Sequence, residues 1–111
     1  MIRIPTHRAP THPGEMLEEE FLKPYGMTQS RLAELTGVPF QRINQIVNGK
    51  RGVTPDTALR LSRVFGTSPQ FWLNMQNAWD MYHTLAESRG EIQRIRTLPQ
   101  AARRARSFEG A

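Results

Sequence analysis

The sequence of 111 residues contains no cysteine, which excludes disulfide bonds and thiolate metal sites. It has no apolar run long enough for a signal peptide or a membrane span, because Arg, His and Pro interrupt the N-terminal segment MIRIPTHRAPTHPGE. The histidines His7, His12 and His83 lack the helical spacing of metal ligands, and the glutamates at 18–20 lie in a row instead of converging. We therefore expect a soluble cytoplasmic protein that is not an enzyme, needs no metal or other cofactor, and does not bind a membrane.

Positive charge is concentrated in two parts of the sequence. Residues 28–63 carry six basic and two acidic side chains, and residues 89–111 carry the same numbers, so each part has a net charge of +4. Residues 1–27 have three basic and four acidic groups, and residues 64–88 have none and two. A basic surface attracts the phosphate backbone of nucleic acids without reading its sequence. The positive charge alone is weak evidence for nucleic-acid binding. It becomes stronger because residues 28–63 also contain the predicted pair of helices described next.

The most informative segment is TQSRLAELTGVPFQRINQIVNGK, which predicts two short helices around a tight turn. Thr28 is a favoured N-cap for a helix over residues 29–36, because its hydroxyl can accept a backbone N–H of the first turn. Within that helix, Leu32 and Leu35 share one face. Gly37 can adopt a positive φ, so we expect it to end the helix and turn the chain.

A second helix is predicted over residues 39–48, with Pro39 as its first residue, where the missing N–H would have had no intrahelical partner. Ile43, Ile46 and Val47 form its apolar side, which packs on the preceding helix. The other side carries groups that can bind base edges and phosphates or touch a thymine methyl, namely Phe40, Gln41, Arg42, Asn44 and Gln45.

The alternative interpretation is an ordinary helical hairpin with a solvated polar face, and four details oppose it. Ala33 is small enough for close helix approach, and the turn glycine, Gly37, follows four residues later. The outward face is rich in Gln, Asn and Arg, and the basic residues Lys50 and Arg51 come directly after it. We therefore interpret the segment as a DNA-reading helix-turn-helix.

Three more helices complete an all-α fold of five helices. The first opens at Pro13 with His12 as its cap, the fourth spans residues 55–65 after the cap Thr54, and the fifth spans residues 69–88 after the cap Ser68. The fifth helix carries more aromatic surface than one side of a small domain readily hides, so we expect part of it to form either core or a dimer or partner interface. The organisation is one helix-turn-helix domain over residues 1–88 and a basic C-terminal tail over residues 89–111.

Both ends of the chain leave alternatives open. In residues 1–10, Ile2 and Ile4 alternate with polar residues, which indicates a short strand or a clamped arm. In the tail, Ile92 and Ile95 lie in an alternating segment that could add a strand beside the N-terminal one. Residues 101–111 are mostly Ala and Arg and are equally consistent with disorder.

Three segments outside the turn carry a family resemblance: HPGE at 12–15, NGKRGVTPDTALRL at 48–61 and GTSPQFWLNMQ at 66–76. With them, residues 12–82 resemble the HigA-type antitoxins, a branch of the lambda-repressor-like (Xre) helix-turn-helix superfamily. The resemblance implies a lambda-repressor-like fold and a homodimer that binds a palindromic operator, as double-stranded DNA, in its own promoter. It also implies a complex with a HigB-type toxin, a small ribonuclease of the RelE type. The competing hypothesis is a stand-alone Xre-type repressor without a toxin.

The resemblance also assigns roles within the helix-turn-helix. It implies phosphate contacts from both ends of the motif, at Thr28, Gln29, Asn48, Lys50 and Arg51. It implies base reading at Phe40, Gln41 and Gln45, flanked by Arg42 and Asn44. Pro39 and Phe40 depart from the polar residues that usually open this helix in the superfamily. For Phe40 the expectation is therefore contact with a thymine methyl, or a wedge against the backbone.

Overall fold

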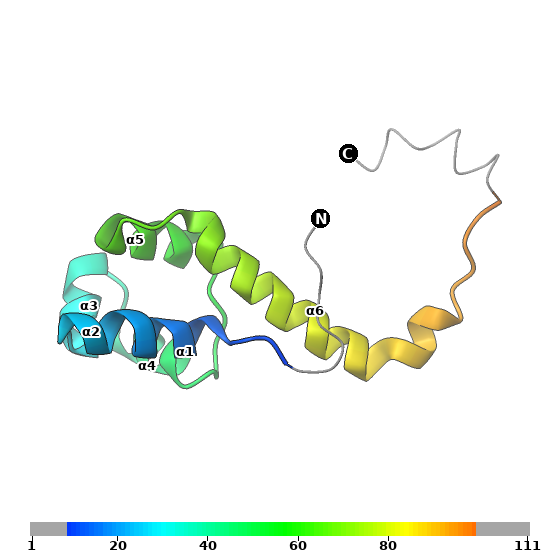
Figure 1. Ribbon diagram of the computed structural model, residues 1–111, viewed down its shortest axis with the longest axis horizontal. Coiled ribbons are helices and arrows are strands. Elements are labelled where there is room, and N and C mark those ends of the chain that lie inside the picture. The colour runs from blue at the N-terminus through cyan, green and yellow to red at the C-terminus, as the bar shows by residue number, and fades with distance from the viewer. Residues whose placement is uncertain (1–8, 100–111) are drawn as a thin grey trace.

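A computed structural model describes residues 9–99, which form five helices and no strand within that range. The first helix is continuous and comprises α1 (Pro13–Leu17), a π-helical turn η1 (Glu18–Leu22) and α2 (Lys23–Tyr25). The other four are α3 (Gln29–Thr36), α4 (Phe40–Val47), α5 (Pro55–Phe65) and α6 (Pro69–Gln93). Figure 1 shows α1 to α5 in one compact group, from which the C-terminal half of α6 projects. The prediction of an all-α fold with five helices is confirmed.

Local sequence explains where the helices begin. The first helix, α3, α5 and α6 each start after a side chain that accepts a hydrogen bond from a backbone N–H of the first turn. The donor–acceptor distances are 2.9, 3.0, 3.4 and 3.2 Å, and the caps are the predicted His12, Thr28, Thr54 and Ser68. Gly37 has a φ of 74° and ends α3 in the left-handed conformation, as its sequence position predicts.

The recognition helix, which is α4, the second helix of the helix-turn-helix, starts one residue later than predicted. Pro39 is the N-cap of α4 and not its first helical residue, because its ψ of 142° is extended. Its carbonyl already accepts the backbone N–H groups of Arg42 and Ile43, at 3.0 and 3.2 Å. The reason lies in the preceding residue, Val38, which is buried and donates its N–H to the Thr36 hydroxyl, so the turn is still being completed at Pro39.

Leu35 does not share the buried face of α3 as predicted, since 44% of its surface is exposed. The buried residues of α3 are Leu32 and Thr36, four positions apart. The Thr36 hydroxyl donates to the Leu32 carbonyl at 2.7 Å and accepts from Val38, so a polar side chain is fully satisfied inside. Because these two residues define the centre of the inward face, Leu35 lies at its edge.

The last helix is longer than predicted and continues to Gln93 instead of ending at residue 88. Helix-favouring Arg, Glu and Gln outweigh the single Gly90 in this stretch. Ile92 is therefore helical, and Ile95 lies beyond the helix in backbone that is not a strand, so the predicted tail strand is wrong for the described residues. The expectations for residues 1–8 and 100–111 lie outside the described part of the chain.

The core joins all five helices around Trp72, which is fully buried and donates its Nε1–H to the Thr67 hydroxyl at 2.8 Å. The other core residues are aliphatic and come from the other four helices and from two turns: Leu17, Leu22, Leu32, Val38, Ile43, Ile46, Val53, Ala58 and Leu61. Within residues 9–99, no helix combines the length and the hydropathy needed to cross a membrane.

One glycine sets the distance between the first helix and the recognition helix. Gly14 lies where α1 crosses the end of α4, and a Cβ at this position would overlap the Ile46 carbonyl. The HPGE segment therefore has a structural role, because only a residue without a side chain lets α1 support α4 this closely.

Candidate nucleic-acid interface

The outward face of α4 carries most of the predicted base-reading side chains. Ile43 and Ile46 are fully buried and fix the rotation of the helix about its axis. With that rotation, Gln41 and Phe40 are exposed, whereas Arg42, Asn44 and Gln45 are half-buried. The structure thus brings the five predicted residues to one side of the domain.

A hollow of about 250 Å³ lies on this face, lined by Pro39, Gln41, Arg42, Gln45 and Arg51. Two guanidinium groups and two amides converge in it, which is the donor set that binds phosphate oxygens and guanine or adenine edges. A larger hollow of about 510 Å³, between the first helix and α6, includes three glutamates in its lining: Glu15, Glu19 and Glu20. The negative charge of that second surface would repel phosphates, so the α4 face is the one suited to nucleic acid.

Gln45 is held in place by the loop that follows α4. The Arg51 Nε–H donates to the Gln45 Oε1 at 2.8 Å, and the Lys50 backbone N–H donates to the Gln45 carbonyl at the same distance. The bond from Arg51 uses the oxygen of the Gln45 amide and leaves its NH₂ to donate to a base. A predicted base reader and two predicted phosphate contacts are thus one hydrogen-bonded unit.

A second chain of hydrogen bonds links the two helices of the motif. The Asn44 Nδ2 donates to the Gln29 Oε1 at 3.0 Å, and the Asn48 Nδ2 donates to the Asn44 Oδ1 at 3.2 Å. Asn44 is therefore oriented by its neighbours, one at the N-terminus of α3 and one at the end of α4. Because the Gln29 oxygen is occupied, its NH₂ group is left as the donor that a phosphate oxygen requires.

Thr28 completes the cluster at the N-terminus of α3. Its Oγ1 accepts from the Arg31 backbone N–H, so its hydroxyl proton can still donate to a phosphate oxygen. The free N–H groups of a helix N-terminus favour an anion at the same place. Phe40 differs from the other predicted residues because its side chain has no polar group, and it leaves 49% of its surface exposed at the start of α4.

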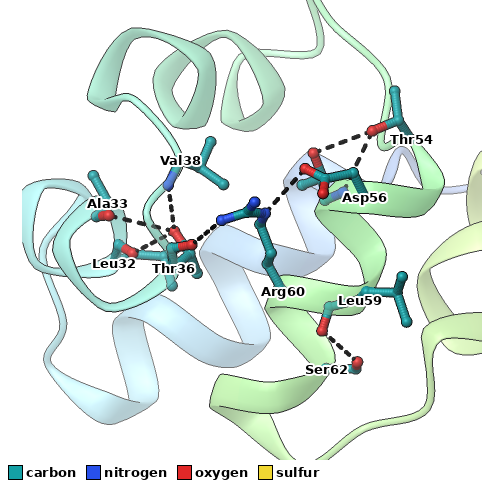
Figure 2. Close-up of polar contacts among 10 residues, drawn as sticks. Leu32, Ala33, Thr36, Val38, Thr54, Asp56, Leu59, Arg60 and Ser62 are labelled. Atoms are coloured by element: carbon teal, nitrogen blue, oxygen red, sulfur yellow. Dashed lines mark hydrogen bonds and ion pairs between the residues drawn. The ribbon is translucent and has the colours of Figure 1, made fainter.

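Arg60 of α5 braces the turn of the helix-turn-helix, as Figure 2 shows. Its Nη1 donates to the Thr36 carbonyl at 2.8 Å, and its Nε pairs with the Asp56 carboxylate at 3.0 Å. The ion pair is exposed and contributes little alone, but it orients the guanidinium toward the turn. The sequence prediction missed this role, because nothing in the spacing of Asp56 and Arg60 indicates a target on α3.

Two further residues that position the site were also missed, Gly14 and Gln76. Gly14 lies against the Ile46 carbonyl, and Gln76 of α6 accepts the backbone N–H of Val53 at 2.8 Å. Gly14 could have been noticed as a glycine in the first turn of a helix. Gln76 has no comparable signal in the sequence, because the amides Asn74 and Asn77 lie close to it.

No metal centre is indicated in the part of the chain from residue 9 to residue 99, where no three His, Asp or Glu side chains are grouped to hold an ion. Among the histidines, His12 is buried and its Nδ1 accepts the Gly14 N–H. Burial lowers the pKa of His12, opposed by the carboxylates of Asp80 and Glu15. The ring packs edge-on against Trp79, with centroids 4.9 Å apart, so it is a structural cap and not part of the α4 face.

Residues 19–72 match a helix-turn-helix domain family model. The chain is 39% identical over 94 residues to antitoxin HigA-1 of Vibrio cholerae, covering 84% of this chain and 88% of that protein. The chain belongs to the HigA-type antitoxin family of helix-turn-helix proteins. As a member of this family it is a regulator of the helix-turn-helix class and not an enzyme.

Two other proteins are also similar to this chain. Virulence-associated protein I of Dichelobacter nodosus is 56% identical over 70 residues, which cover 63% of this chain and 65% of that protein. A solved structure of Pseudomonas aeruginosa antitoxin HigA with the higBA promoter superimposes with a TM-score of 0.77. The identity to that structure is 37%, over 81% of this chain and 99% of the other.

Proposed function

We propose that this protein is the antitoxin of a toxin–antitoxin pair and that it represses its own operon by binding an operator through α4. The observation that carries the proposal is the hydrogen-bonded unit of Gln45 and Arg51, which lies on the exposed face of α4. It joins a base-reading amide to a phosphate-binding cation within one geometry. The P. aeruginosa relative, whose structure contains promoter DNA, supports the same use of the fold.

In the proposed mechanism, a homodimer places its two α4 helices in successive major grooves, with half-sites about 34 Å apart. Gln41 and Gln45 discriminate bases, whereas Arg42, Lys50 and Arg51 supply affinity for the backbone. The Thr28 hydroxyl and the Gln29 NH₂ bind a phosphate at the N-terminus of α3, and Asn48 binds one after α4. Phe40 packs on a thymine methyl or against the sugar-phosphate backbone.

The second part of the proposal is that the protein neutralises a small ribonuclease toxin of the HigB type. Membership in the HigA-type antitoxin family supports it. Operator binding and toxin binding then reside in one chain. This chain acts as a repressor when it binds the operator and as an antitoxin when it binds the toxin.

The deciding experiment has two arms on the purified full-length protein. In the first, fluorescence anisotropy compares a duplex from upstream of its own gene with a scrambled duplex, and we expect at least a 1,000-fold preference, roughly the lower end for specific operators. In the second, the tagged protein is co-expressed with the product of the adjacent reading frame. Co-purification with suppression of RNA cleavage supports the antitoxin role. Operator binding without a co-purifying toxin would favour the stand-alone repressor instead.

A further inference from the structure

One polar side chain of α6, Gln76, lies against the loop that follows the recognition helix. Its Oε1 accepts the Val53 backbone N–H at 2.8 Å, and its Nε2 donates to the Asp80 Oδ1 at 2.9 Å. A backbone N–H can only donate and a carboxylate can only accept, so the two partners allow a single orientation of the amide. The side chain is partly buried, where an unmade hydrogen bond costs more than at the surface.

The loop after α4 leaves space for the side-chain amide of Gln76. A Cβ on Gly52 would lie 2.8 Å from the Gln76 Nε2 and 3.0 Å from its Oε1, so the glycine leaves the space that the amide occupies. The next residue, Val53, is buried in the core and supplies the N–H. The bond from Gln76 therefore fixes the C-terminal end of the loop.

The N-terminal end of the loop is fixed by α4 itself. The backbone N–H groups of Gly49 and Lys50 donate to the carbonyls of Ile46 and Gln45, at 3.0 and 2.8 Å. Between the two fixed ends, Arg51 reaches back to the Gln45 side chain at 2.8 Å. Five residues separate the end of α4 from Val53: the helix cap Asn48, then Gly49, Lys50, Arg51 and Gly52.

We propose that Gln76 is a positioning residue for DNA recognition. Through the Val53 N–H it holds the loop so that Arg51 meets a phosphate and orients Gln45 toward a base, although Gln76 itself touches neither. A loop already held in its bound conformation does not lose that conformational entropy on binding, and this raises affinity. The inference rests on the operator binding proposed above.

Two variants remove the contact between Gln76 and the loop, one by a change in α6 and the other by a change in the loop. Gln76→Met keeps the length and helix propensity of the side chain but cannot accept the Val53 N–H. Gly52→Ala keeps Gln76 but fills the space of its amide, and the flexible end of that side chain can move aside. Both should weaken operator binding by about tenfold, the effect of losing one strong hydrogen bond. The slope of log K against log salt concentration should become shallower by about 0.9, because one phosphate contact is lost.

A rescue variant tests the chemistry of the contact. Gln76→Glu combined with Asp80→Asn retains an acceptor for the Val53 N–H and reverses the direction of the second hydrogen bond. We expect it to restore most of the affinity and the salt slope. The matched control is Asn74→Met, which also replaces an amide of α6 by methionine but at an exposed position. It should change neither the operator affinity nor the salt slope.

A double-mutant cycle separates positioning from stability. Arg51→Ala should weaken DNA binding strongly in the wild-type background and much less in Gln76→Met, because the positioned contact is already lost. Circular dichroism melts show that each variant is folded at the binding temperature. Equal effects of Arg51→Ala in both backgrounds, or an unchanged salt slope in folded Gln76→Met and Gly52→Ala, would overturn the inference. Failure of the wild-type protein to prefer its operator would instead overturn the proposed function on which the inference depends.

Discussion

At the residue scale, the interface is organised before any DNA arrives. Gln45 is bonded to Arg51, and Asn44 is bonded to both Gln29 and Asn48. These bonds occupy the amide oxygens of Gln45 and Gln29 and leave their NH₂ groups as donors. In the proposed interface, bases and phosphates would therefore meet side chains whose rotamers are already selected. The proposal also separates residues that read sequence from residues that only attract charge.

The pair Gln45→Ala and Lys50→Ala tests that separation. Loss of the Gln45 amide should reduce discrimination between operator and scrambled DNA by about 1–3 kcal/mol, because a base-edge contact is lost. Lys50→Ala should weaken binding to both duplexes alike and reduce the salt slope by about one, because it removes a phosphate contact. Anisotropy titrations over a range of salt concentrations measure both effects. If Gln45→Ala lost the same affinity on both duplexes, Gln45 would not be a base reader.

His12 gives the fold a dependence on pH. Burial lowers its pKa from the ordinary value near 6.5, and its Nδ1 must remain unprotonated to accept the Gly14 N–H. The unfolded chain binds the proton more readily, so the free energy of unfolding should be constant above about pH 7 and fall as the pH decreases below about 6.5. Chemical denaturation at a series of pH values measures this change.

The control for His12 is His12→Asn, which keeps a cap acceptor but cannot titrate in this range. Its free energy of unfolding should vary less between pH 7 and pH 5.5, roughly the window set by an ordinary histidine. Identical slopes for the two proteins would show that the pH dependence arises at other groups.

At the element scale, the position of the recognition helix α4 is fixed by contacts from three other helices. Gly14 brings α1 against the Ile46 carbonyl at the end of α4, and Arg60 joins α5 to the turn before α4. Gln76 joins α6 to the loop after it. The helix is therefore held at its start, its end and the loop beyond by three different helices.

Gly14→Ala tests the closest of these contacts. The added methyl would overlap the Ile46 carbonyl, so α1 and α4 must separate, and we expect a loss of about 1–3 kcal/mol in the free energy of unfolding. Gly90→Ala is the matched control, because it lies in α6 with no atom closer than 3.8 Å to the new methyl. It should stabilise the protein by about 0.5–1 kcal/mol through helix propensity. Equal melting temperatures for the two variants would contradict the close crossing.

At the scale of the whole molecule, α6 has two parts with different surroundings. Its first turns carry Trp72 into the core, whereas its second half projects from the group of helices, as Figure 1 shows. Around the middle of α6, where this half begins, Trp79 and Tyr82 are half-buried and Met81 is 40% exposed. Apolar side chains on a projecting helix favour a dimer interface, which the proposed binding to two half-sites also requires.

Met81→Lys tests the dimer. An ammonium group at a buried interface has no partner and costs several kcal/mol, so sedimentation velocity should show a shift from dimer to monomer. Operator affinity should fall with it, because the two half-sites are no longer bound by one linked unit. Leu59→Lys places the same charge on an exposed position of α5 and should leave the dimer intact. A Met81→Lys protein that remained dimeric would show that the interface lies elsewhere.

Most of the fold could be predicted because its signals are local. The caps Thr28, Thr54 and Ser68 and the turn at Gly37 depend on residues within a few positions, and all are confirmed. The end of α6 was placed too early although its helix-favouring residues are also local. Two other errors arose where packing in the core decides the outcome. Val38 in the core delays the start of α4, and the buried Thr36 moves Leu35 to the surface.

The amino-acid sequence by itself determined the five helices, the basic helix-turn-helix and the family, because caps, turn glycines and apolar spacing act over short distances and the family motifs are contiguous segments. Only the tertiary structure decided how the predicted DNA contacts are joined. Arg51 meets Gln45, Asn44 meets Gln29, and Gln76 meets Val53 through contacts between separate elements, and the last pair lies 23 positions apart. Such contacts depend on how helices pack around Trp72, and no local pattern in the chain encodes them.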